Sequence, residues 1–313
     1  MPYKSLSSPR QVVDVSAEIR ASATLASPSL VAMLSTDPVR LALQPAGGGT
    51  GKVTPVTVSS GDDVALLSRD VAVVRSGDDV WALLDLAHSA KVEQVARDAR
   101  AIRGRPAGEA ALVLGWDGSA TALTLGKHEV DARPFALRGT VRAIDLEGNE
   151  TFVVVDGTGG GELRIHPGAT PEPAATGRVA LPGAAAELDR IRAGGPLSVL
   201  FNPGRREVCI VQQTGGRLSA KMIELDVSPT DLAVSETSLL AIFADGRATL
   251  YDGAALAAAG DGPLAPTATL RLGARGEPTT MTLSGRASPT LWVGTGAGEV
   301  LQIGVVKKGS VGL

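Results

Sequence analysis

Short apolar runs separated by glycine-containing turns recur along most of the chain. The clearest copy is SETSLLAIFADGRATLYDG, residues 235–253, which reads as two strands over 239–243 and 248–251. We expect Asp245-Gly246 to join them in a type I′ turn, because glycine tolerates the positive φ that a tight hairpin requires. Six further stretches follow the same pattern, beginning at Leu30, Val71, Ala111, Phe152, Leu197 and Thr290.

The spacing of these hairpins predicts the fold class. Their turn centres recur about every 40 to 50 residues, which is the period of β-propeller blades. Central strands such as AIF and TLY are apolar on both faces, as expected where neighbouring blades cover a sheet on both sides. The sequence therefore predicts an all-β, seven-bladed β-propeller of four-stranded antiparallel blades, forming a single domain over residues 1–313.

The two ends of the chain predict how the ring closes. The last repeat lacks its outer strand, whereas VVDVSAEI, residues 12–19, reads as a strand with no hairpin partner nearby. We expect this N-terminal strand to complete blade 7, with residues 11–20 as the closing segment and residues 1–10 as a loose tail. Such closure removes two exposed sheet edges. In blade 5 the first strand, AELDRIRA from Ala186, is weaker, and its composition also allows a short helix.

Two aspartates, Asp85 in LLD and Asp252 in LYD, stand near the end of the third strand of their repeats. Together with the period and the four-stranded blades, they make the chain similar to WD40-type propellers over nearly its whole length. The repeats differ from that family in two respects: no Gly-His pair precedes the blades, and the one Trp-Asp pair, Trp116-Asp117, lies in a turn instead of at the end of a strand. The chain thus resembles a divergent WD40-like protein, and no site residue follows from the resemblance.

Composition bounds the partners and the compartment. The chain has 30 Lys and Arg and 33 Asp and Glu residues, a formal net charge of -3, which indicates no general attraction to nucleic acid or to an anionic membrane. No run approaches the roughly 18 apolar residues needed to cross a bilayer. We therefore expect a cytoplasmic protein. Cys209, the single cysteine, lies in the apolar stretch EVCIV, where a buried thiol is expected.

Motifs for catalysis are scarce. The stretch AGGGTGKV from Ala46 resembles a phosphate-binding loop, but it lacks the first glycine and the Ser or Thr of that motif, so a loop between two strands is expected. The three histidines, His88, His128 and His166, have no metal-ligand spacing and are expected in exposed loops. No nucleophile motif is present. We therefore expect neither enzymatic activity nor a cofactor.

Charges at the predicted turns indicate a docking surface. In a propeller, the turns between the second and third strands (B–C turns) and the links between blades (D–A links) emerge on one face. Early blades place seven aspartates there: Asp37, Asp62, Asp63, Asp78, Asp79, Asp98 and Asp117. Later blades place five arginines there: Arg138, Arg205, Arg206, Arg247 and Arg275. We expect a bipolar face that orients a protein partner. The expected contact residues are Asp37, Asp62, Asp63, Asp78, Asp79, Asp117, Arg205, Arg206 and Arg247.

Three functions fit this sequence. The first is a non-catalytic scaffold for protein–protein interaction, as a structural subunit of a larger bacterial or phage assembly. The second is an enzyme or small-ligand binder that uses the central channel, and the third, less expected, is a nucleic-acid platform. Converging acids, histidines or a metal in the channel would favour the second, and a plain channel the first. Arg100, Arg103 and Arg105 are expected to be solvated surface. Because propellers host unrelated functions, the fold alone does not choose.

Overall fold

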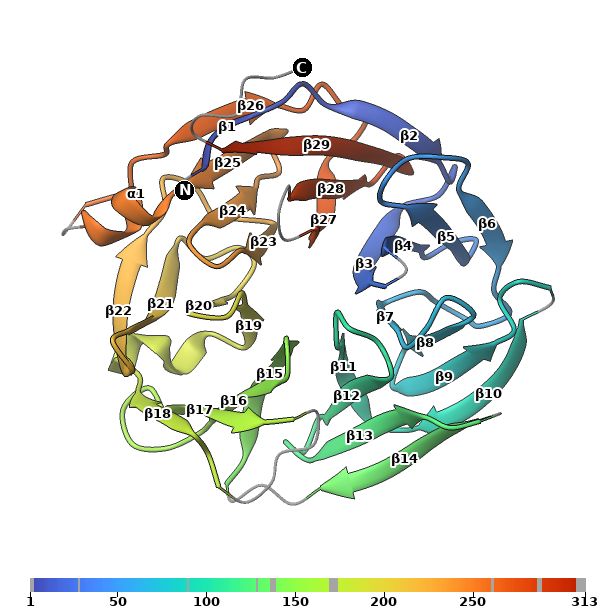
Figure 1. Ribbon diagram of the computed structural model, residues 1–313, viewed down its shortest axis with the longest axis horizontal. Coiled ribbons are helices and arrows are strands. Elements are labelled where there is room, and N and C mark those ends of the chain that lie inside the picture. Colours follow the sequence, from blue (N-terminus) through green and yellow to red (C-terminus); the bar gives the residue numbers. More distant parts are fainter. Residues whose placement is uncertain are drawn as a thin grey trace.

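The computed structural model of the protein describes residues 3–27, 29–88, 90–127, 129–135, 139–168, 174–259, 262–285 and 289–307. Seven antiparallel β-sheets surround a central axis, in sequence order around the ring (Figure 1). Six of these sheets have four strands and the seventh has five. The predicted all-β, seven-bladed propeller is therefore confirmed.

Each blade runs from an innermost strand, A, to an outer strand, D. Blade 1 consists of β3 (Ile19–Ala26), β4 (Ser29–Ser35), β5 (Arg40–Pro45) and β6 (Lys52–Pro55). Blade 2 consists of β7 (Asp63–Leu66), β8 (Val71–Ser76), β9 (Asp79–Leu84) and β10 (Lys91–Ala96). Blade 3 consists of β11 (Ala99–Gly104), β12 (Ala110–Gly115), β13 (Ala120–Leu125) and β14 (Val130–Phe135).

The remaining blades follow the same order. Blade 4 consists of β15 (Val141–Glu147), β16 (Glu150–Val155), β17 (Glu162–Pro167) and β18 (Gly177–Ala180). Blade 5 consists of β19 (Arg190–Ala193), β20 (Leu197–Phe201), β21 (Glu207–Thr214) and β22 (Arg217–Glu224). Blade 6 consists of β23 (Asp231–Val234), β24 (Leu239–Ile242), β25 (Arg247–Tyr251) and β26 (Ala268–Arg271). Blade 7 consists of β27 (Pro278–Ser284), β28 (Thr290–Thr295) and β29 (Glu299–Lys307), with β1 (Tyr3–Leu6) and β2 (Arg10–Asp14).

The core lies between neighbouring blades. The B strands β12 and β20 are buried at every position, because adjacent sheets cover both of their faces. One apolar cluster joins Leu34 of blade 1 to Val64 and Val74 of blade 2, and another joins Ile19 of blade 1 to Trp292 of blade 7. The absence of inside/outside alternation in these strands therefore reflects burial on two sides.

The N-terminal segment closes the ring, as predicted, but in two pieces. Asp14 accepts a hydrogen bond from the backbone of Ser16 at 2.8 Å, and Ser16 has a φ of 54°, so the closing strand ends at Asp14 and Ile19 opens blade 1 instead. The prediction of a loose tail over residues 1–10 is wrong for the described part, because β1 pairs with the far end of β29. Strand β29 is nine residues long and β2 covers only its first half, so β1 covers the edge that would otherwise stay open.

The hairpin at Gly246 has a different turn from the predicted one. The Phe243 amide donates to the Arg247 carbonyl at 3.0 Å, and the Gly246 amide donates to the Phe243 carbonyl at 3.0 Å. Gly246 has a φ of 80°, whereas Asp245 does not have positive φ. A type I′ turn requires positive φ at both central residues, so this is a three-residue loop that ends on a left-handed glycine.

Helical structure is confined to two short segments among the described residues. A 3₁₀ helix spans Gly183–Glu187, and strand β19 follows it. The stretch from Ala186, for which the sequence allows either a strand or a short helix, therefore contains the end of this helix and all of β19. Helix α1 (Gly253–Ala257) follows β25, and Asp252 caps it by accepting from the Ala255 amide at 2.9 Å. Neither segment has the length and apolar character that a membrane-spanning helix needs.

Candidate functional site

The central channel is the main cavity of the ring. Residues from all seven innermost strands line it, and it encloses about 1350 Å³. The innermost strands β3, β7, β11, β15, β19, β23 and β27 face the axis in Figure 1. Six arginines and eight acidic residues line this cavity, so the channel is charged and not plain.

Three channel aspartates join neighbouring blades. Asp63 of blade 2 accepts a hydrogen bond from the Ile102 amide of blade 3 at 2.8 Å. Asp145 of blade 4 accepts from the Ala193 amide of blade 5 at 2.7 Å. Asp231 of blade 6 accepts from the Met281 amide of blade 7 at 3.0 Å. A carboxylate on the innermost strand of blades 2, 4 and 6 thus binds the backbone of the following blade.

Other side chains join the blades in between. Arg100 of blade 3 donates to the Val141 carbonyl of blade 4 at 3.2 Å. Arg192 of blade 5 donates to the Leu232 carbonyl of blade 6 at 3.2 Å and pairs with Asp231 at 3.1 Å. Thr279 of blade 7 donates to the Ile19 carbonyl of blade 1. Much of the charge in the channel therefore serves to hold one blade to the next.

Burial shapes the protonation of the channel carboxylates. Asp145 is only 9% exposed, and desolvation raises its pKa although Arg192 and Arg103 act in the opposite direction. The pKa of Arg192 is raised: desolvation opposes this shift, but the carboxylates of Asp231 and Asp145 outweigh it. Arg192 also lies over the Phe201 ring, 5.7 Å from its centroid.

Four charged side chains of the inner wall have no hydrogen bond or ion pair among the described residues: Glu150, Asp189, Arg190 and Glu236. Arg190 is the one arginine of the four. It lines the channel on β19 and is exposed to it, yet its side chain makes no hydrogen bond or ion pair among the described residues. Desolvation by the surrounding wall lowers its pKa, Asp231 and Asp63 raise it, and Arg103 and Arg192 lower it. Arg190 therefore lies within the electrostatic reach of two other arginines without a partner of its own.

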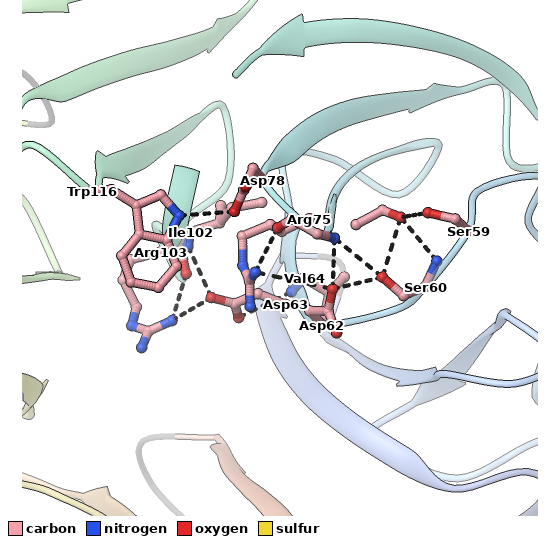
Figure 2. A network of polar contacts seen from close by, with 12 residues as sticks. Ser59, Ser60, Asp62, Asp63, Val64, Arg75, Asp78, Ile102, Arg103 and Trp116 are labelled. Carbon is pink, nitrogen blue, oxygen red and sulfur yellow. Dashed lines mark hydrogen bonds and ion pairs between the residues drawn. The ribbon is translucent and has the colours of Figure 1, made fainter. Parts of the chain in front are cut away.

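At the channel mouth, four residues form a cluster that we name the acidic patch: Asp78, Asp98, Trp116 and Asp117. Trp116 is 62% exposed, and its Nε1 donates to Asp78 Oδ1 at 2.9 Å, as Figure 2 shows. The Trp116 amide donates to the Asp98 carbonyl at 3.0 Å, and the Ala99 amide donates to the Asp78 carbonyl at 2.9 Å. The B–C turns of blades 2 and 3 and the link between them thus form one continuous surface.

The predicted acidic contacts divide into exposed and internal residues. Asp37, Asp78 and Asp117 are exposed, and Asp79 is half-buried, where it accepts from Gln94 Nε2 at 2.6 Å. Asp62 and Asp63 point inward instead (Figure 2). Asp62 accepts hydrogen bonds from Gly77 and Ser60 and pairs with Arg75. Asp63 accepts hydrogen bonds from Val64, Ile102 and Arg103.

The arginines of the predicted face that the structure describes are paired with carboxylates. Arg205 pairs with Glu187, and Arg206 pairs with Glu224 at 2.9 Å. Arg247 pairs with Asp226 at 2.9 Å and with Asp245 at 2.6 Å, and Arg275 pairs with Glu299 at 2.9 Å. Arg138 lies outside the described residues. The expected bipolar face is therefore locally neutralised on its basic side, whereas Asp37 and the aspartates of the acidic patch make no ion pair among the described residues.

The remaining chemistry-bearing residues lie outside the channel. His88 is exposed and 2.8 Å from Asp85, but His166 is buried in β17, so the prediction of an exposed loop is wrong for it. His128 lies outside the described residues. Cys209 is buried, as predicted, and burial raises the pKa of its thiol to about 12. Among the described residues, no three His, Cys, Asp or Glu side chains are placed to hold a metal ion.

Sequence reasoning missed most of the channel. Arg103 was expected to be solvated, but its side chain is 16% exposed and bonds to Asp63. The signal available was the repeated stretch of Asp, aliphatic, Ala, aliphatic that opens two innermost strands, DVAL from Asp63 and DLAV from Asp231. The glycine-rich stretch from Ala46 is a loop between β5 and β6, as predicted.

The chain is a seven-bladed propeller, and no family within that fold is assigned to it. No protein-family model and no curated protein matches it, so its placement rests on the fold itself.

Proposed function

We propose that this protein is a non-catalytic scaffold for protein–protein interaction, with the acidic patch as its docking surface. The observation that carries the proposal is an exposed tryptophan held in place by an aspartate at the rim of a closed ring. Tryptophan is enriched among the residues that dominate binding energy, and a pre-held ring loses little conformational freedom on binding. A closed propeller is a rigid support for such a surface.

The charge of the patch specifies the partner. Asp78, Asp98 and Asp117 surround Trp116 without an ion pair, and hydrogen bonds from Ser119 lower the pKa of Asp117, which keeps it ionised. A basic segment complements these carboxylates, and a Lys or Arg side chain stacks on an indole face. We therefore expect a partner protein that presents a Lys- or Arg-rich segment.

The finer assignments belong to the same proposal. A WD40-like origin is supported by the four-stranded blades and by Asp85 and Asp252, which directly follow the third strands of blades 2 and 6. A cytoplasmic location and membership of a larger bacterial or phage assembly are also part of the proposal. The described lining residues of the channel include no histidine and no cysteine.

Affinity capture from the native host tests the proposal. We expect wild-type protein to retain a partner with a basic segment, Trp116→Ala to lose it, and Val227→Ala to keep it. Val227 is a matched control, because it is 39% exposed on a D–A link of the same face, in the sector opposite the patch. Retention of the same proteins by all three forms would contradict docking at Trp116.

A small-ligand binder that uses the channel is the second candidate. Converging acids were one expected sign of such a function, and eight acidic residues line the channel. Six of the fourteen charged residues that line the channel join neighbouring blades. Among the described residues, the carboxylates of Glu150, Asp189 and Glu236 are left over, and so are Arg190 and a few neighbouring donors. Those leftover donors favour binding over catalysis.

A further inference from the structure

Two aspartates of the channel, Asp231 and Asp63, have most of their acceptor sites occupied. Asp231 accepts from four groups, Leu232, Arg192, Thr280 and Met281. Asp63 accepts from three groups, Val64, Ile102 and Arg103. An ionised carboxylate has about four acceptor sites, so these two aspartates have little capacity left for a cation or a donor from outside.

The arginines of the same cluster have donors to spare. Arg190 uses none of its five N–H groups within the described residues. Arg103 uses only Nη1, and its Nε is buried without a partner. Arg192 uses Nε and Nη2, which leaves Nη1. The three arginines therefore have N–H donors that Asp63 and Asp231 do not occupy, and they outnumber these two aspartates.

These donors converge from two sides of the channel. Arg190 and Arg192 alternate on β19 and so project from the same face of that strand, while Arg103 reaches the cluster from β11, two blades away. Both Arg103 and Arg192 affect the pKa of Arg190, which places all three within electrostatic range of one another. Like charges held together without a bound anion repel one another, and an anion relieves this repulsion.

We propose that Arg190, Arg103 and Arg192 form a binding site for a small oxyanion, a molecule that carries a carboxylate or a phosphate. Guanidinium groups bind either oxyanion through paired N–H···O hydrogen bonds, and these bonds are stronger than those between neutral groups. The channel encloses about 1350 Å³ and Arg190 is exposed to it, so it has room for such a molecule beside this arginine. This site is separate from the acidic patch and does not depend on a protein partner.

Calorimetric titration of the purified protein tests the site. Citrate and succinate probe carboxylates, inorganic phosphate and pyrophosphate probe phosphates, and sodium chloride at matched ionic strength controls for screening. We expect saturable binding of one class at concentrations up to about 10 mM. The class that binds identifies the source of the oxyanion, whereas no saturable binding of any of the four anions would overturn the proposal.

Variants assign the binding to Arg190. Arg190→Gln is expected to weaken binding about tenfold or more, because it removes charged hydrogen bonds. Arg190→Lys is expected to lose less, since it keeps the charge without the paired donors. Arg20→Gln is the matched control: Arg20 lines the same channel but pairs with Glu18 at 3.1 Å, and its loss should change affinity less than twofold. Equal affinity in wild type and Arg190→Gln would overturn the assignment.

Folding of the variants is checked without anion. The Arg190 side chain makes no hydrogen bond in the described structure, so Arg190→Gln should melt within about 2 °C of the wild type. If Arg190→Gln melts lower than this, the comparison is made with Arg190→Lys, which is expected to bind more weakly than wild type in the same titration. Unchanged affinity in a well-folded Arg190→Lys together with unchanged affinity in Arg190→Gln would place the anion elsewhere.

Discussion

Asp145 and Ala193 join blades 4 and 5 inside the channel, where the Asp145 carboxylate accepts the Ala193 amide at 2.7 Å. The same arrangement recurs from Asp63 to Ile102 and from Asp231 to Met281. Each bond satisfies a backbone amide on an innermost strand, where no further strand is available to pair with it. Buried acids in this ring therefore have a structural role before any functional one.

Replacement of Asp145 should separate its hydrogen bond from its charge. Asp145→Ala leaves the Ala193 amide without its acceptor and is expected to lower the free energy of unfolding by about 1–3 kcal/mol. Asp145→Asn keeps an acceptor oxygen and is expected to cost less. Urea unfolding of both variants at neutral pH measures the difference, and equal costs would show that the amide contact contributes nothing.

The stability of wild type and that of Asp145→Asn should depend differently on pH. Burial raises the pKa of Asp145 in the folded state above its value in the unfolded chain. The stabilisation that follows from this shift is fully present below the unfolded pKa, and it is lost as the pH rises through the folded pKa. The stability of Asp145→Asn relative to wild type is therefore expected to increase between about pH 4 and pH 8. Parallel stability profiles across this range would contradict the shift.

The fold could be predicted from the sequence because each repeat contains the hydrophobic pattern of its own blade. The run AIF of β24 is apolar without alternation, and its burial on both sides by neighbouring blades follows from that pattern. The site was less accessible, because Asp63 and Asp62 stand beside a glycine and resemble turn acids. Their inward orientation depends on where the neighbouring blade places Ile102, a contact 39 residues away that no local pattern specifies.

Strand β2 should be essential to ring closure. Removal of residues 1–14 leaves the edge of β29 unpaired, and we expect aggregation or a melting temperature lower by roughly 5 °C or more. Removal of residues 1–6 is the matched control, because β2 still pairs with Glu299–Gln302 and the loss should be smaller. Equal melting temperatures for the two truncations and the full chain would contradict closure by the N-terminal segment.

Cys209 provides a probe of ring opening. It is buried in β21, and burial raises the pKa of its thiol to about 12, so almost no thiolate exists at pH 8. We expect an aromatic disulfide reagent to modify the native protein only at the rate of unfolding. Modification of folded protein at the rate of a free thiol would show that Cys209 is accessible.

Gly246 should tolerate only residues that accept a left-handed backbone. Its φ is 80°, and an added Cβ would meet no atom within 4 Å, so a substitution there is strained by conformation and not by crowding. Gly246→Val is expected to cost on the order of 1–3 kcal/mol, and Gly246→Asn less, because asparagine is found in this conformation more often. Similar stability for both variants would mean that the backbone of the loop adjusts freely.

The two aspartate pairs of blade 2 have different environments in the structure. Asp62 and Asp63 bond to the Gly77 and Ile102 amides. Their joint reversal to lysine should cost roughly 3 kcal/mol or more, because it leaves both amides without acceptors and breaks a partly buried ion pair. The Asp78 carboxylate accepts only from the exposed Trp116 side chain, and the Asp79 carboxylate accepts only from the surface side chain of Gln94, so the reversal of this second pair should leave the melting temperature nearly unchanged.

Association of the second variant with the partner then tests the acidic patch. Asp78 and Asp79 attract a basic segment over a range set by the Debye length, about 10 Å at 0.1 M salt, so their reversal should slow association most at low ionic strength. Association rates measured from about 20 to 500 mM salt should therefore differ strongly between wild type and variant at the low end and converge at the high end. Identical rates over the whole series, from a variant that melts like wild type, would move the docking surface away from blades 2 and 3.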